Sequence, residues 1–173
     1  MLKNKNNKWV EILEITAEVW TEMIREITLD KIPMLLDCAE KLLQNGGNEA
    51  ICAGIYTYAI EEYGKLLLLK KYTPVDGKVK IKYKEEFRNH TAKFGIAIKN
   101  LPTECYILSK GIFDPDIFDK QIFDVGVLAD LEARQAIFYS DFTDSAKGIK
   151  SAPSVDKDLL QKAMQQFKRL WSS

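Results

Sequence analysis

The residues best suited to chemistry are the chain's only histidine, His90, and the adjacent glutamates Glu61 and Glu62. An imidazole changes charge near neutral pH, and a nearby carboxylate can orient it. A buried charge without a partner costs several kcal/mol, so Glu62 is expected either to hold its proton or to be paired, with Lys65 and His90 as the obvious partners. The sequence therefore predicts a polar cluster inside an apolar helical bundle, which serves either as a structural lock or as a working site.

Helical periodicity is the reason for placing Glu62 and His90 inside. At about 3.6 residues per turn, each lies in the middle of an apolar stripe. The stripe around Glu62 contains Ile51, Ile55, Tyr58, Ala59, Leu66 and Leu69. The stripe around His90 contains Tyr83, Phe87, Phe94, Ala97 and Leu101. Both side chains are predicted to face neighbouring helices.

The other charged residues of this region have simpler interpretations. Glu61 and Lys65 are four residues apart in the order that favours a surface ion pair. Lys93 is predicted to extend along the bundle surface, with phosphate neutralisation as the alternative. Arg88 is separated from His90 by about 200° of helical rotation, so it is predicted to face solvent.

A second polar group lies near the C-terminal end. Arg134 follows Asp130 by four residues and precedes Asp141 by two turns, so a structural network and phosphate recognition both explain it. Metal-free RNA cleavage needs a base for the 2′-hydroxyl, an acid for the leaving oxygen and a cation for the phosphorane. His90, Tyr139 and Arg134 are the candidates for these roles, provided that the fold brings them together.

A metal site is the competing interpretation of His90. Glu86 is four residues before it, and Glu62 could face both, as in carboxylate-bridged bundles. One histidine is too few for the usual paired Glu-x-x-His pattern. We therefore predict neither a metal nor a cofactor.

Composition indicates one cytoplasmic domain without a membrane span. The 173 residues, 46% of them hydrophobic, suffice for one buried core but not for two large ones. Lys plus Arg and Asp plus Glu balance at 25 each, so RNA must be bound by a local patch. Cys38, Cys52 and Cys105 lack metal-type spacing and are predicted to be reduced, the first two in the core. No apolar stretch is long enough for a signal peptide or a membrane span.

The elements that must position these residues are predicted to be helices. Apolar periodicity and turn residues place them at 9–29, 33–44, 48–71, 80–100, 125–143 and 155–171. Residues 1–8 are expected to be disordered, 109–124 to form a loop with at most one short helix, and 145–154 to link to the last helix. No strand pair is evident. The predicted fold is all-α, an up-down bundle of four to six helices in a single domain over residues 1–173.

Three separated motifs resemble those of a known family. The first covers 36–43, a glycine break and 50–65, which ends in Ala-Ile-Glu-Glu-Tyr-Gly-Lys. The second is Phe-Arg-Asn-His-Thr-Ala-Lys-Phe at 87–94, and the third covers 133–141. Three motifs in the same order are more specific than any one of them. Over residues 35–144 the chain resembles the AbiV-type abortive infection family, within the HEPN superfamily of helical bundles.

The resemblance implies a HEPN-like fold and a prokaryotic antiviral role, as a toxin that halts growth of an infected cell. Many HEPN relatives are metal-independent ribonucleases that act as dimers, so RNA such as tRNA or mRNA and a second copy are the implied partners. Trp9, Trp20 and Trp171, near the two ends of the chain, add to the homodimer prediction.

The superfamily's catalytic pair is an arginine followed four to six residues later by a histidine. Here Arg134 is followed by Tyr139. Tyrosine, with a pKa near 10, is a poor base at neutral pH, although it can donate a proton. Two functions follow: a growth-arresting ribonuclease, or a non-enzymatic bundle that binds a viral or ribosomal protein.

Overall fold

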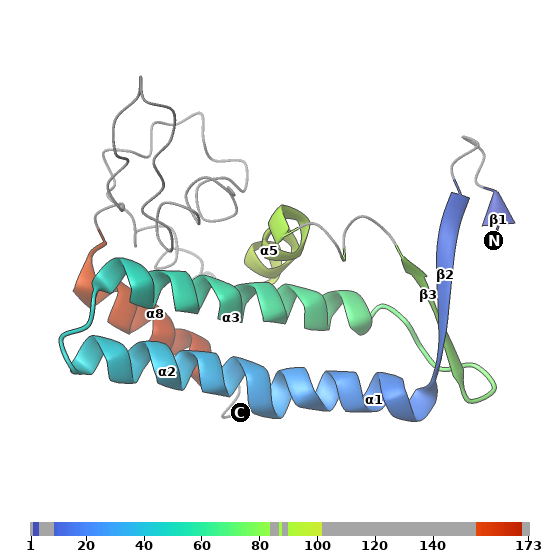
Figure 1. Ribbon diagram of the computed structural model, residues 1–173, viewed down its shortest axis with the longest axis horizontal. Coiled ribbons are helices and arrows are strands. Elements are labelled where there is room, and N and C mark those ends of the chain that lie inside the picture. Colours follow the sequence, from blue (N-terminus) through green and yellow to red (C-terminus); the bar gives the residue numbers. More distant parts are fainter. Residues whose placement is uncertain (1, 4–8, 84–86, 88–89, 102–154, 171–173) are drawn as a thin grey trace, which may run out of the picture.

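The computed structural model describes residues 2–3, 9–83, 87, 90–101 and 155–170, and this part of the chain is mostly helical. Its elements are β1 (Leu2–Lys3), β2 (Trp9–Thr16), α1 (Ala17–Arg25), the π-helix η1 (Glu26–Lys31), α2 (Ile32–Gln44), α3 (Glu49–Leu69), β3 (Lys78–Tyr83), α5 (His90–Asn100) and α8 (Lys157–Arg169). Helices α1 and α2 join through η1 into one long rod, and α3 returns antiparallel beside it (Figure 1). Helix α3 contacts α2, α5 and α8, so it is the central element.

Side-chain caps explain where the helices begin. Thr16, Asn48 and Asp156 each accept a hydrogen bond from a backbone N–H one turn into α1, α3 and α8, respectively. Between α2 and α3 the chain turns at Gly46, whose φ of 74° favours glycine. The helices predicted at 33–44, 48–71 and 155–171 are confirmed, with ends that differ by at most two residues.

The prediction of helices at 9–29 and 80–100 is wrong in the first part of each segment. Strand β2 occupies the start of the first, and helix begins only at Ala17. Strand β3 occupies the start of the second, and α5 begins at His90. The two strands pair antiparallel, with Thr16 opposite Lys78, and β1 lies on the other edge of β2. The molecule is therefore a helical assembly with a small three-stranded sheet at one end (Figure 1).

The sequences of the strands explain this error. Strand β3 reads Lys-Val-Lys-Ile-Lys-Tyr, which alternates charged and apolar residues with a period of two. Strand β2 reads Trp-Val-Glu-Ile-Leu-Glu-Ile-Thr, rich in β-branched residues, which favour strands. The helical spacing of the apolar residues in α1 and α5, which complete the two segments, extended the predicted helices over these strands.

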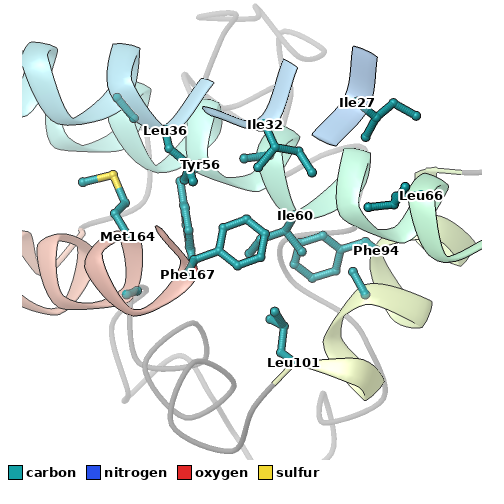
Figure 2. Close-up of a cluster of buried hydrophobic side chains, with 14 of the residues drawn as sticks. Ile27, Ile32, Leu36, Tyr56, Ile60, Leu66, Phe94, Leu101, Met164 and Phe167 are labelled. Carbon is teal, nitrogen blue, oxygen red and sulfur yellow. The ribbon is translucent and has the colours of Figure 1, made fainter. Parts of the chain in front are cut away.

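The core is one apolar cluster shared by the helices and β3. Figure 2 shows its larger side chains, among them Ile27, Ile32, Leu36, Tyr56, Ile60, Leu66, Phe94, Leu101, Met164 and Phe167. The ring of Phe167 meets those of Tyr56 and Tyr63 edge-on, at centroid distances of 6.0 and 5.7 Å. These contacts fix α8 against α3. The two helices are far apart in the sequence, since more than fifty residues separate α8 even from α5.

Several predictions concern residues outside the described ranges. They include the helix at 125–143, the loop at 109–124 and the linker at 145–154. Residues 1–8 were expected to be disordered, but residues 2–3 form strand β1. The single domain over 1–173 stays a prediction. Among the helices that the structure describes, none is long and apolar enough to cross a membrane.

Candidate functional site

Glu61 is a buried carboxylate at the contact between α3 and α5. Its side chain is 6% exposed, and its Oε1 lies 2.6 Å from His90 Nδ1 and 2.7 Å from Lys93 Nζ. Lys93 is buried as well, whereas 52% of the His90 side chain is exposed. The charge of Glu61 is thus balanced by a buried ammonium group, while the same oxygen holds an imidazole that remains open to solvent. We call Glu61, His90 and Lys93 the polar cluster.

Helix geometry brings the three residues together. His90 is the first residue of α5, and Lys93 follows three residues later, so both project on the same side. Gly64 lies three residues after Glu61, one turn along α3, where α5 crosses it. A Cβ atom at Gly64 would overlap the Lys93 carbonyl oxygen. Only glycine therefore allows α5 to approach closely enough for Lys93 and His90 to reach Glu61.

The predicted roles of the two glutamates are reversed in the structure. The surface ion pair expected for Glu61 and Lys65 is wrong, because Glu61 is buried and Lys65 pairs with Glu62 at 3.4 Å. Glu62 is partly exposed, so the prediction that it faces the core is also wrong. The stripe that contains it is not one buried face: Ala59, Leu66 and Leu69 are buried, whereas Ile51 and Tyr58 are each 39% exposed.

The two predictions for α5 also need correction. His90 was expected in the middle of a helix facing inward, but it begins α5 and is half exposed. Lys93 was expected to be solvated, yet it is buried against Glu61. Both side chains lie where α5 packs closely on α3, so the carboxylate of Glu61 is their partner. By contrast, the predicted burial of Phe94, Ala97 and Leu101 is confirmed.

Sequence reasoning missed the part played by Gly64. A glycine within an otherwise apolar helix costs helical stability, and a packing requirement is the usual explanation. That signal was available in Glu-Glu-Tyr-Gly-Lys, but it could not say which helix would approach.

The other predicted site residues are not placed. Arg134, Tyr139, Asp141, Arg88 and Glu86 lie outside the described residues. The structure therefore brings together Glu61, His90 and Lys93 and sets Glu62 and Lys65 apart as a separate pair. In the part of the chain that is described, no three His, Cys, Asp or Glu side chains are grouped so that they could hold a metal ion.

The polar cluster has the arrangement needed for proton transfer by histidine. When Nδ1 carries the proton and donates it to Glu61, Nε2 keeps its lone pair and can act as a base. Nε2 forms no hydrogen bond within the described ranges. Because Lys93 already balances the charge of Glu61, the imidazole need not be protonated for the carboxylate to be stable in the core.

The cysteines give a mixed outcome. Cys52 is buried in α3, as predicted, and burial raises the pKa of its thiol. Cys38 is exposed on α2, so its predicted place in the core is wrong. Both are free thiols. Cys105 lies outside the described residues.

Comparison with family models, curated proteins and solved structures found no match to this chain. The likeness to the AbiV-type family therefore rests on the three motifs alone.

Proposed function

We propose that this protein is a prokaryotic antiviral effector of the AbiV type, with a HEPN-like fold, that arrests growth by cleaving RNA without a metal ion. The observation that carries the proposal is the contact of His90 Nδ1 with the buried carboxylate of Glu61, in a ring that is half exposed. A histidine held in this way and open on its other side is suited to proton transfer at neutral pH.

The proposed reaction uses the ribose hydroxyl as its nucleophile. His90 Nε2 takes the 2′-hydroxyl proton, and the oxygen attacks the adjacent phosphorus. The bond to the 5′-oxygen breaks, that oxygen receives a proton, and a 2′,3′-cyclic phosphate remains. Tyr139 is the proposed proton donor and Arg134 the proposed cation that stabilises the phosphorane. In this scheme Lys93 does not contact phosphate, because Glu61 already binds it in the core.

A homodimer is part of the proposal and rests on the family resemblance. Trp20 does not support it, because its indole N–H donates to the Leu69 carbonyl within the same chain. Light scattering after size exclusion at micromolar concentration should show a dimer, and a monomer would reject this part of the proposal.

Incubation of the purified protein with total bacterial RNA and tRNA in EDTA tests the activity. Discrete fragments on a denaturing gel are expected, and His90→Gln and Arg134→Ala should lower the rate by about 10²-fold or more. Glu62→Gln is the matched control for Glu61→Gln, because it makes the same change at the neighbouring position outside the polar cluster. Glu61→Gln should slow cleavage and Glu62→Gln should not.

Intact RNA in every lane would reject the ribonuclease. It would leave the second interpretation, a non-enzymatic bundle that binds a viral or ribosomal protein, with the polar cluster as a structural lock between α3 and α5.

Tyr139→His adds an independent check, since it restores the superfamily's Arg-x4-His pair. It should raise the cleavage rate if Arg134 and residue 139 act together, whereas an unchanged rate would remove Tyr139 from the site.

A further inference from the structure

An open groove of about 600 Å³ lies where η1 and α2 meet the end of α8. Leu29, Asp30, Pro33, Met34, Asp37 and Lys168 line it. The groove shares no lining residue with the polar cluster, which lies between α3 and α5. It is therefore a second feature of the described surface, and the argument for it does not depend on the proposed ribonuclease.

The groove exposes large apolar side chains at its rim. Leu29 is 61% exposed and Met34 is 62% exposed, while Leu36 at its base is fully buried. Leu29 of η1 and Met34 of α2 lie beside the same groove, so together they form a local apolar patch. Methionine is flexible and polarisable, which suits a surface that adapts to an apolar partner.

The backbone at this groove is unusual. Leu29 and Asp30 belong to η1, a π-helix that interrupts the rod formed by α1 and α2. π-helical turns are rare, occur mostly as interruptions of α-helices, and are frequent at functional sites. The polar cluster does not account for this π-helix, since none of its three residues belongs to η1.

Charge indicates what kind of partner fits. Residues 17–44 contain six acidic and three basic residues, although the whole chain is balanced. Asp37 is paired with Lys41 at 2.7 Å, and Glu26 is paired with Lys31 at 3.1 Å. Asp30, at the groove, forms no ion pair with any described residue.

Arg25, the cation that interacts with Asp30 at longer range, is held by Glu22 at 2.7 Å. Asp30 is thus available to a cation from outside. Lys168, which also lines the groove, is held by Glu40 and lies 3.9 Å from Asp37. The charged groups at the groove are therefore two carboxylates and one ammonium group, and Asp30 is the carboxylate to which no described cation is bound.

We propose that this groove binds a basic amphipathic helix of a partner protein. An apolar side chain of that helix covers Leu29 and Met34, and a lysine or arginine one turn away pairs with Asp30. This is the helix-in-groove mode of recognition, in which apolar anchors supply affinity and flanking charges select the partner.

Synthetic peptides serve as the probe. A fluorescein-labelled peptide of about 16 leucine and lysine residues in an amphipathic order is titrated with the full chain, and anisotropy is measured. A scrambled peptide of the same composition and an acidic peptide with glutamate in place of lysine are the controls. The basic amphipathic peptide should bind about tenfold more tightly than either control.

Variants then locate the binding site. The double variant Leu29→Ser, Met34→Ser and the single variant Asp30→Lys should each weaken binding about tenfold or more, because they remove the anchors or the charge. Val75→Ser is the matched control, since Val75 is 68% exposed and does not line the groove. It should leave binding unchanged.

Equal binding of the scrambled peptide, or undiminished binding by the groove variants, would overturn the proposal. If the variants fold poorly, a measurement on the unaltered protein still tests the proposal. The methyl NMR signal of Met34 should shift when the basic amphipathic peptide is added, and an unmoved signal would overturn the proposal as well.

Discussion

Glu61 and Glu62 are adjacent in the sequence, yet the fold gives them different physical roles. Glu61 lies in the core with a buried lysine beside it, and Glu62 is partly exposed and pairs with a partly exposed lysine. Removing one partner of a buried ion pair leaves the other charge uncompensated, whereas a surface pair contributes little. The two positions therefore form a natural pair for comparing buried and exposed carboxylates.

Glu61→Gln should lower the free energy of unfolding by about 3 kcal/mol, because Lys93 would lose its counter-charge in the core. Glu62→Gln should change it by less than about 0.5 kcal/mol. Urea unfolding followed by circular dichroism measures both. Adding Lys93→Met to Glu61→Gln should recover part of the loss. Equal effects of Glu61→Gln and Glu62→Gln would contradict the assigned burial.

Gly64→Ala should destabilise the protein by about 2–3 kcal/mol, because the new methyl group would overlap the Lys93 carbonyl oxygen and push α5 away from α3. The sign of the change in the free energy of unfolding shows whether α5 contacts Gly64. At an exposed helical position the same substitution stabilises by roughly 0.5–1 kcal/mol. Thermal and urea unfolding of the variant give the sign directly, and a stabilised variant would show that the two helices do not meet at this residue.

At the scale of elements, the close packing of α5 on α3 determines the site. The backbone of Lys93 meets Gly64, and this approach brings the side chains of His90 and Lys93 to Glu61. The sequence predicted α2, α3 and α8 well, since each combines apolar periodicity with a cap or a breaker. It did not predict the sheet, whose strands depend on pairing between segments more than sixty residues apart.

The β2–β3 pairing makes a prediction about pH. Lys78 Nζ lies 2.7 Å from Glu14 Oε1, and the hydrogen bond and charge of Lys78 hold the pKa of Glu14 below its ordinary value of 4.5. Because the folded-state pKa is lowered, the pair stabilises the fold above pH 4.5, and this contribution is lost as the pH falls through the folded-state pKa.

Glu14→Gln should therefore be slightly less stable than the unaltered protein at pH 7, and the difference should shrink as the pH falls below 4.5. Urea unfolding over a series of pH values measures it. Glu49→Gln, which changes a carboxylate in the first turn of α3 that forms no ion pair with a described residue, controls for the general effect of lost charge. A difference that persists unchanged at low pH would contradict the pairing of Glu14 with Lys78.

At the scale of the whole molecule, α8 completes a core that the N-terminal helices begin. Phe167, Met164 and Leu160 are buried against residues that precede them by about a hundred positions. Apolar periodicity alone predicted that α8 has a buried face, but not which helix it covers, because periodicity carries no information on partners. The candidate site is predictable to the same extent. The sequence indicates which residues could do chemistry, but not which of them contact one another.

Phe167→Ala should cost about 3–5 kcal/mol, because it removes a fully buried ring that contacts Tyr56 and Tyr63. Leu159→Ala, on the partly buried side of α8, is a milder change in the same helix. Urea unfolding compares the two. Near-equal, small losses would show that α8 does not contribute to the core.

The measurement that tests the central claim most directly is the ¹⁵N NMR spectrum of the imidazole, which is unambiguous because the chain has one histidine. At a pH where the ring is neutral, the contact of His90 with Glu61 predicts the tautomer protonated at Nδ1, with Nε2 unprotonated and available as a base. Glu61→Gln should shift the ring toward the other tautomer, and Glu62→Gln should leave it as it is. A wild-type ring protonated at Nε2, unaffected by Glu61→Gln, would contradict the account.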